Sequence, residues 1–292
     1  MLMKLEPYAD DLDVRHPFIC SENLLLALRT GGDIDTGAVE MLMPYDRLRN
    51  AWLPSVEVPN DILPFKLLGF TGSRTFRMVS ATVNHIGGSD CDACISVVTF
   101  TITEDFNSIV LAAPPQVAII RKIKFVFEVH EVDGKLIVVS FETDANTVVH
   151  EVCGTTVNEV ARFPNRYVNR SCIINGRFVF TDHGDGDENW WQLFSYDFDT
   201  KQTMAVLGKK WGAENTCRFT PNGTLMVRRS NDARITVYNL SSDLEHSPSY
   251  VVHPVIPDGI DDIHPMPSGH IGICSQNRDY ENPVKWAAQR KG

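Results

Sequence analysis

The 292-residue sequence has almost no helical periodicity. We find no stretch of about a dozen residues that spaces its apolar side chains every three or four positions and is also free of proline and glycine. Short runs rich in β-branched and aromatic residues dominate instead, such as 94–102, 122–129 and 135–141, and turn-forming residues bound them. Such runs are typical of β-strands. The sequence therefore predicts an all-β chain.

Long apolar runs and basic clusters are also missing. No apolar run reaches the roughly 18 residues of a membrane-spanning helix, and the N-terminus has no apolar core of a signal peptide. The formal net charge is −10, whereas nucleic-acid binding needs a basic surface to displace phosphate counterions. The densest basic stretch, 121–124, is predicted to be a strand with alternate side chains in water. We expect neither a membrane nor a nucleic acid as partner.

Cysteine is scarce and unpaired: there are seven, an odd number. An odd count without a signal sequence favours reduced thiols, and hence the cytoplasm or the nucleus. The spacing of Cys91 and Cys94 suits zinc or a redox disulfide, but neither a second cysteine pair nor a βαβ context accompanies it. The loop 182–189 is rich in oxygen ligands but lacks the spacing of a calcium-binding EF-hand loop. No metal site and no cofactor are predicted.

A turn followed by a strand recurs along the chain. The turns Asp133-Gly134, Asn175-Gly176 and Asn222-Gly223 each precede an apolar run, and Glu22-Asn23 and Ser268-Gly269 do the same. Asn-Gly and Asp-Gly suit hairpins because a type I′ turn needs positive φ at both central residues. Each unit continues with a second strand, a polar loop, a third strand and a short fourth one, which predicts repeated four-stranded sheets.

The first unit resembles the kelch repeat. Paired Gly31 and Gly32 are followed by Tyr45-Asp46 and then by Trp52, and Gly87-Gly88 with Phe100 repeats the pattern more weakly. In the kelch repeat the glycines end the second strand, the tyrosine lies on the third and the tryptophan on the fourth. The later units depart from this pattern, and 219–240 is more similar to a WD40 blade.

Both resemblances imply a β-propeller, whose radial closure protects the edges of its sheets. We expect one domain over residues 1–292, an all-β, six-bladed β-propeller of four-stranded blades, with the N-terminal strand closing the ring. The predicted blades are 14–62, 63–117, 118–165, 166–211, 212–256 and 257–292 plus 1–13.

Propeller topology places the loops between second and third strands on one face. Here these loops are 31–37, 87–93, 142–146, 182–189, 230–233 and 276–282, and their acidic residues far outnumber the basic ones. Asp and Asn favour turns whatever the function, but clustered charge also attracts an opposite surface. The predicted partner-binding residues are Asp33, Asp35, Asp90, Asp92, Asp182, His183, Asp185, Asp187, Glu188, Trp191, Arg229, Asp232 and Asp279.

The leading hypothesis is a non-catalytic module for protein–protein interaction, or a scaffold subunit of a larger complex, that binds a basic protein partner through this acidic face. No catalytic residue is predicted for it, because no catalytic motif with the required strand–turn–helix context is present. One alternative is a propeller enzyme, epimerase-like or lyase-like, acting on a sugar or small metabolite at an axial site that draws on Asp182, His183, Arg228 and Arg229. The other alternative is a purely structural subunit.

Overall fold

The structure is a computed structural model. It describes residues 2–3, 5–9, 19–21, 23–31, 39–46, 48–49, 51–59, 62, 64–85, 91–142, 146–183, 190–212, 215–219, 223–229, 234–240, 249–254, 262–265, 271–274 and 284–287. These residues form β-strands and turns and contain no helix, which confirms the all-β prediction. Within this part of the chain there is accordingly no helix that could span a membrane.

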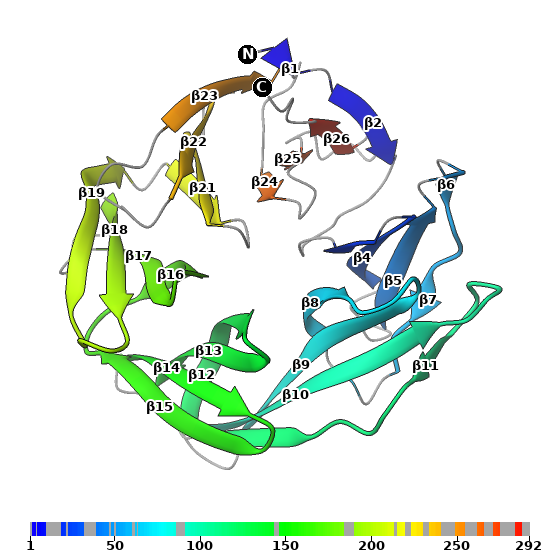
Figure 1. The fold of residues 1–292 in the computed structure, drawn as a ribbon, viewed down its shortest axis with the longest axis horizontal. Coiled ribbons are helices and arrows are strands. Elements are labelled where there is room, and N and C mark those ends of the chain that lie inside the picture. Colours follow the sequence, from blue (N-terminus) through cyan, green and yellow to red (C-terminus); the bar gives the residue numbers. More distant parts are fainter. Residues whose placement is uncertain are drawn as a thin grey trace.

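Five sheets, built mainly of antiparallel strands, are arranged in a ring (Figure 1). The first sheet contains β3 (Ile19–Cys20), β4 (Leu24–Gly31), β5 (Val39–Asp46) and β6 (Ala51–Trp52), with β7 (Val56–Glu57) also paired to β5. The largest sheet has the order β15 (Thr156–Phe163), β14 (Thr147–Cys153), β13 (Lys135–Glu142), β12 (Val117–Val132), β10 (Cys91–Ile102), β9 (Thr75–His85) and β8 (Pro64–Phe70), and β11 (Ile109–Leu111) pairs with β10.

Three further sheets complete the described ring. One contains β16 (Val168–Ile174), β17 (Arg177–His183), β18 (Trp190–Asp197) and β19 (Thr203–Gly212). The next contains β20 (Asn215–Phe219), β21 (Thr224–Arg229), β22 (Ile235–Asn239) and β23 (Ser249–Pro254), with β1 (Leu2–Met3) parallel to β23. The last contains β24 (Asp262–Pro265), β25 (Ile271–Cys274), β26 (Val284–Ala287) and the N-terminal strand β2 (Leu5–Ala9), which pairs with β26.

The hairpin turns have the predicted geometry where they are described. Asp133 and Gly134 have φ of 50° and 77°, and Asn175 and Gly176 have φ of 50° and 76°. Two successive positive φ values are the signature of the type I′ turn, whose twist matches that of the paired strands. The Asp-Gly and Asn-Gly signals therefore set the register of the hairpins that follow.

Strand β12 departs from the predicted unit boundaries. Residues 63–117 and 118–165 were expected to form separate sheets, but β12 pairs with β10 through its first half and with β13 through its second half. No proline or glycine interrupts the sequence between Val117 and Val132, so no turn breaks the strand. It bends instead at Lys122, whose φ is 59°. The two predicted units are thus one continuous sheet.

The described core consists of separate apolar clusters between sheet faces. One joins the first sheet to β8–β10 through Leu26, Leu42, Phe76 and Phe100, and the rings of Phe76 and Phe100 stack 5.8 Å apart. Others lie between the two halves of the largest sheet, between β13–β15 and the sheet of β16–β19, and between that sheet and β20–β23. In the described part of the chain, neighbouring sheet faces therefore bury apolar side chains against each other.

The first strand of each sheet or half-sheet lies toward the middle of the ring. Contacts join β3 to β8, β12 to β16, β16 to β20 and β20 to β24. Figure 1 shows β8, β16 and β24 on the inner side of the ring. Side chains from sheets that are distant in sequence can therefore meet on these inner strands.

Candidate functional site

Most of the predicted acidic face lies outside the described residues, namely Asp33, Asp35, Asp90, Asp185, Asp187, Glu188, Asp232 and Asp279. Only the backbone is described for His183, at the end of β17, and for Arg229, at the end of β21. Side chains are described for Asp92, which is half-buried in β10 rather than in a loop, for Asp182 and for Trp191.

Asp182 does not belong to an exposed loop. It lies in β17 opposite Gln192, and only 2% of the residue is exposed. Its carboxylate lies 3.3 Å from a guanidinium nitrogen of Arg166, whose guanidinium also covers the ring of Phe194 at 4.9 Å. The structure therefore corrects the expected position of Asp182, which is a buried, paired residue of β17 and not part of an exposed loop.

The predicted contact residue Trp191 is also buried, with 4% exposed. Its ring stacks on Trp211 at 4.4 Å, and its indole N–H donates to the carbonyl oxygen of Asn215 at 3.0 Å. These contacts join β18 and β19 to β20, which is a packing role between two sheets. The neighbouring Trp190 is half-buried, with the Lys210 ammonium 3.7 Å from its ring centroid.

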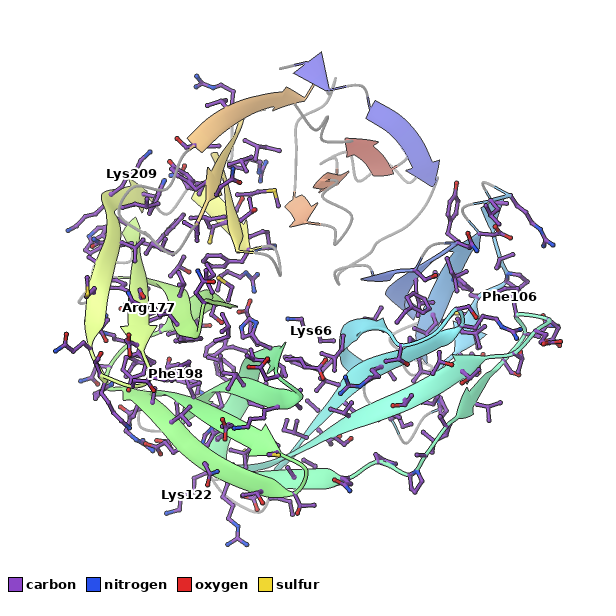
Figure 2. The ribbon with its side chains drawn as sticks, viewed as in Figure 1. Lys66, Phe106, Lys122, Arg177, Phe198 and Lys209 are labelled. Atoms are coloured by element: carbon purple, nitrogen blue, oxygen red, sulfur yellow. The ribbon has the colours of Figure 1, made fainter. Side chains whose placement is uncertain are left out.

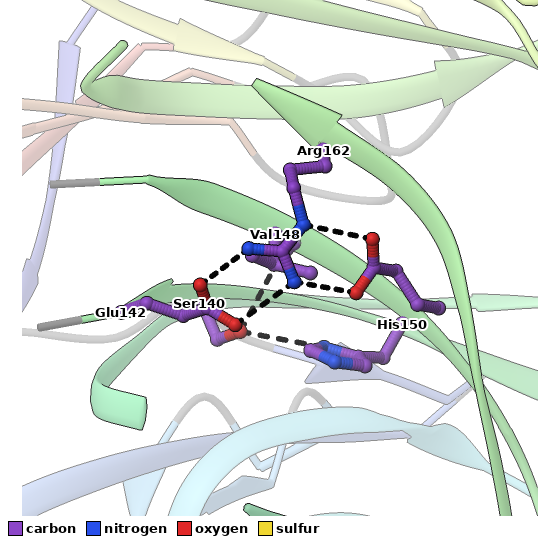
Figure 3. Close-up of polar contacts among 6 residues, drawn as sticks. Ser140, Glu142, Val148, His150 and Arg162 are labelled. Atoms are coloured by element: carbon purple, nitrogen blue, oxygen red, sulfur yellow. Dashed lines mark hydrogen bonds and ion pairs between the residues drawn. The ribbon is translucent and has the colours of Figure 1, made fainter. Parts of the chain in front are cut away.

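The acid Glu142 of the predicted loop 142–146 is neutralised by a residue that is distant in sequence. Arg162 of β15 bridges Glu142 and Glu159, and these ion pairs raise the pKa of its guanidinium (Figure 3). Beside them the buried Ser140 donates to the carbonyl oxygen of Val148 at 3.2 Å and lies 3.4 Å from His150 Nδ1. We call these residues the sheet cluster: Ser140, Glu142, His150, Glu159 and Arg162. All of them lie in β13, β14 and β15.

A second polar group, which we call the axial cluster, lies on the inner strands: Lys66 of β8, Glu128 and His130 of β12, and Ser171 of β16. Glu128 and His130 are two positions apart on a strand, so they project from the same face. Ser171 follows Arg170 on the first strand of the next sheet, which contacts β12. Figure 2 labels Lys66 on the inner side of the ring.

Glu128, His130 and Ser171 form a closed triangle of polar contacts. Oε2 of Glu128 accepts from the backbone N–H of Ser171 at 2.7 Å and from its hydroxyl at 2.6 Å. His130 Nε2 lies 2.8 Å from Ser171 Oγ and 3.4 Å from Glu128 Oε2. The Ser171 hydroxyl proton points to the Glu128 carboxylate, so the Ser171 oxygen must act as acceptor toward His130. The geometry therefore places a proton on Nε2 of His130, which donates to Ser171 Oγ.

This triangle is not a Ser-His-acid triad. In a triad the serine contacts one imidazole nitrogen and the acid contacts the other. Here both Ser171 and Glu128 contact Nε2 of His130. The arrangement therefore keeps Glu128 ionised and oriented, and Ser171 acts by positioning this carboxylate. It can exchange protons with a bound molecule through Glu128 and His130.

Lys66 completes the cluster. Its ammonium donates to the carbonyl oxygen of Val129 at 2.7 Å, directly between Glu128 and His130. Burial lowers the pKa of Lys66, and the negative charge of Glu128 only partly opposes that effect. Burial likewise lowers the pKa of His130, which favours the neutral imidazole near pH 7.

Burial opposes the ionisation of Glu128, but its partners outweigh that cost. The hydrogen bond from His130, the charge of Lys66 and the hydrogen bond from Ser171 lower the pKa of Glu128. The side chains of His130 and Glu128 retain 13% and 20% exposure. Shifted pKa values gathered in one place are a mark of functional sites.

Burial disfavours the thiolate form of the two cysteines near this cluster. Burial raises the pKa of Cys172 well above its ordinary value, and raises the pKa of Cys217 to about 11. Cys91 is buried and Cys94 half-buried, and neither forms a disulfide. Within the described ranges no group of metal-ligating side chains gathers in a metal-binding arrangement.

The axial cluster could have been sought in the run Phe127-Glu128-Val129-His130-Glu131. Ionisable residues alternating with apolar ones in a predicted strand place charge on one face of a sheet. That signal was missed because 122–129 was interpreted only as a strand. No local sequence pattern indicates that Lys66 and Ser171 join Glu128 and His130, because both residues are distant from them in the sequence.

No protein-family model matches the chain, and no curated protein matches it. Among solved structures, a glucose dehydrogenase is similar at 12% identity and a TM-score of 0.52, with 99% of each chain covered. The PQQ-bound aldose sugar dehydrogenase of Streptomyces coelicolor is similar at 10% identity and a TM-score of 0.53, covering 98% of this chain and 97% of that one. An acylaminoacyl peptidase of Pyrococcus horikoshii matches at 8% identity and a TM-score of 0.52, covering 94% of this chain and 51% of that one.

These likenesses concern the fold, which is of the β-propeller type. They also correct the leading hypothesis. The chain shares its architecture over nearly its whole length with proteins named as sugar dehydrogenases, and two acids of the predicted loops, Glu142 and Asp182, are paired with arginines. The prediction of a non-catalytic interaction module or scaffold is therefore wrong, and the enzyme alternative fits better.

Proposed function

We propose that this chain is an enzyme that acts on a sugar or another small metabolite at the axial cluster. The observation that carries the proposal is the convergence of Lys66, Glu128, His130 and Ser171 from three inner strands. The named sugar dehydrogenases among the similar folds support the substrate class. The site differs from the expected one, because Asp182 is engaged with Arg166 and Lys66, Glu128 and His130 supply the reactive groups instead.

The proposal includes a six-bladed, kelch-type ring. Its support is that the inner strands β3, β8, β16, β20 and β24 each lie at the end of a sheet, and that β12 joins the two halves of the largest sheet. Gly31 ends β4, and Tyr45 of β5 pairs with Trp52 of β6, which are the positions that the kelch resemblance implies. Closure of the ring by β2 against β26 completes the arrangement.

The chemistry of the cluster favours proton transfer. Glu128 is ionised and oriented by Ser171, so it can remove a proton from a substrate hydroxyl or from carbon next to a carbonyl. Glu128 can then return that proton to the substrate, while neutral His130 keeps its hydrogen bond through Nε2. Lys66 lies where it can stabilise the negative charge that develops on the substrate oxygen.

The PQQ named for one similar structure is a quinone with several carboxylates, so its binding requires net positive charge. In the axial cluster the Lys66 ammonium is opposed by the Glu128 carboxylate, which Ser171 holds ionised with two hydrogen bonds. The cluster has no net positive charge to offer such a group. These residues do not fit that cofactor, and the proposal contains no step through it.

The test is an NMR screen of neutral aldoses and ketoses in D₂O with the purified protein. We expect one of them to exchange a C–H next to its carbonyl for C–D, or to convert into an isomer. Glu128→Gln should lower that rate, whereas Glu104→Gln, which changes a carboxylate with 91% side-chain exposure, should leave it unchanged.

Equal rates for wild type and Glu128→Gln would contradict the axial site, and no exchange or conversion of any sugar would contradict the substrate class. That the chain binds no nucleic acid and works in the cytoplasm or the nucleus stays a prediction from its composition.

A further inference from the structure

Lys66 differs from the other described lysines in its surroundings. It is half-buried on the inner side of the ring, and its Nζ is held 2.7 Å from the Val129 carbonyl oxygen (Figure 2). Although both side chains are described, no ion pair joins Lys66 directly to Glu128, whose carboxylate is bound by Ser171. The amine is thus positioned by a neutral acceptor next to a fixed acid and a fixed imidazole.

A matched comparison is Lys135. It lies near the surface, and its ammonium is 3.0 Å from the Glu151 carboxylate. That hydrogen bond and charge raise the pKa of Lys135, whereas burial lowers the pKa of Lys66. A lysine becomes a nucleophile when it is desolvated and loses its proton readily. The structure supplies these conditions for Lys66 and the opposite ones for Lys135.

We propose that Lys66 forms an imine with the carbonyl carbon of a neutral aldose or ketose in its open-chain form. The inference rests on the proposed function and names its substrate class and its nucleophile. The Nζ lone pair attacks the carbonyl carbon, the oxygen takes up a proton, and the nitrogen loses one. Water then leaves as the C=N bond forms, so amine and carbonyl give imine and one water without an oxidant or reductant.

The neighbours of Lys66 suit each stage of this step. The Glu128 carboxylate can take up the proton that the Lys66 nitrogen loses and return it to the departing hydroxyl, so that it is ionised again when the imine has formed. The ionised carboxylate of Glu128 stabilises the positive charge of the protonated imine. The same carboxylate can then take a proton from the carbon next to the imine, whose nitrogen accepts the electron pair. The outcome is a redox-neutral isomerisation or epimerisation.

Charge selects the substrate class. The Lys66 nitrogen is held by the carbonyl oxygen of Val129, the residue that follows Glu128. The Glu128 carboxylate is therefore a fixed negative group beside the new C=N bond. A carboxylate on the substrate would place a second negative charge there, and like charges are unfavourable at low dielectric. A neutral sugar is therefore preferred over a 2-oxo acid.

The test is reductive trapping of the full-length protein at pH 7 with sodium cyanoborohydride. D-glyceraldehyde serves as the neutral probe and pyruvate as the anionic one, and peptide mass spectrometry locates the adduct. We expect glyceraldehyde to label Lys66 in clear excess over Lys135, and pyruvate to label Lys66 less. Lys66→Arg should remove the fast-reacting adduct, Lys135→Arg should keep it, and Glu128→Gln should slow it.

Label spread evenly over Lys66 and the exposed lysines would overturn the proposal, and this ratio needs no variant to fold. Preferential labelling by pyruvate would overturn the neutral-sugar class. Full turnover by folded Lys66→Arg of a sugar found in the D₂O screen would overturn the imine while the proposed function stands. Selective trapping at Lys66 without turnover of any sugar would support the imine but contradict the proposed function.

Discussion

The axial cluster and the sheet cluster contain the same types of side chain but differ in how their charges are balanced. Each has a histidine, a serine and a glutamate. In the sheet cluster Arg162 bridges two carboxylates, and all the members lie on adjacent strands of one sheet (Figure 3). In the axial cluster the members come from three inner strands, and a lysine with a lowered pKa replaces the arginine.

The difference separates a structural network from a reactive one. A guanidinium that fits carboxylates through several parallel hydrogen bonds is always charged, so it satisfies its partners permanently. An ammonium held by a carbonyl oxygen beside an oriented carboxylate can still exchange its proton. Residue type alone therefore does not identify a site, but the protonation that its neighbours permit does.

The largest expected effect contrasts Glu128 with Glu142. Because Glu128 is the proposed base, Glu128→Gln should lower turnover by about 10²–10⁴-fold, the usual contribution of general acid–base catalysis. Glu142→Gln should leave turnover unchanged, since Glu142 only pairs with Arg162. Initial rates on the sugar found in the D₂O screen measure both. Equal losses in the two variants would abolish the distinction between the clusters.

The two serines should separate activity from stability. Ser140→Ala removes a buried hydroxyl that donates to the Val148 carbonyl oxygen, and should cost about 1 kcal/mol in the free energy of unfolding without affecting turnover. Ser171→Ala removes the hydroxyl donor of Glu128, so it should also raise the apparent pKa of the base in a pH–rate profile. Urea titration and that profile give the two results. An unshifted profile for Ser171→Ala would contradict its positioning role.

The two histidines should behave alike in stability and differently in activity. Burial lowers the pKa of His130 and of His150 in the fold, from an ordinary value of 6.5. Below pH 6.5 the unfolded chain therefore binds protons that the folded chain does not, and the free energy of unfolding should fall as the pH falls from 7 to 5.

His130→Gln and His150→Gln should each flatten this dependence, but only His130→Gln should lower turnover. Urea titrations at pH 5, 6 and 7 measure the slope. A slope that neither variant changes would show that other groups cause it.

The smallest expected effect is that of Arg162→Lys. The side chain of Arg162 is 37% exposed, and partly exposed ion pairs contribute only about 0.2–1 kcal/mol. Lysine keeps the charge but loses the planar contact with both Glu142 and Glu159. A loss in unfolding free energy within that range, with unchanged turnover, is expected from thermal or urea denaturation. A loss of turnover would link the sheet cluster to the axial one.

Local patterns predicted the strands well, because strand propensity and hairpin turns depend on neighbouring residues. Asp133-Gly134 and Asn175-Gly176 have the required positive φ. Asp182 and Glu142 were assigned to an exposed acidic face because counting charges along loops does not show which ones are paired. Arg166 and Arg162 lie 16 and 20 residues from Asp182 and Glu142, so only folding brings them together.

The sequence by itself determined an all-β chain with repeated hairpins, since alternating apolar side chains and Asp-Gly or Asn-Gly turns act over a few residues. It also placed Glu128 and His130 on one face of a strand. Only the tertiary structure decided that this face lies beside Ser171 and Lys66, which are 43 and 62 residues from Glu128. Burial and charge arise from such distant neighbours, and they alone decide which side chains keep, lose or exchange a proton.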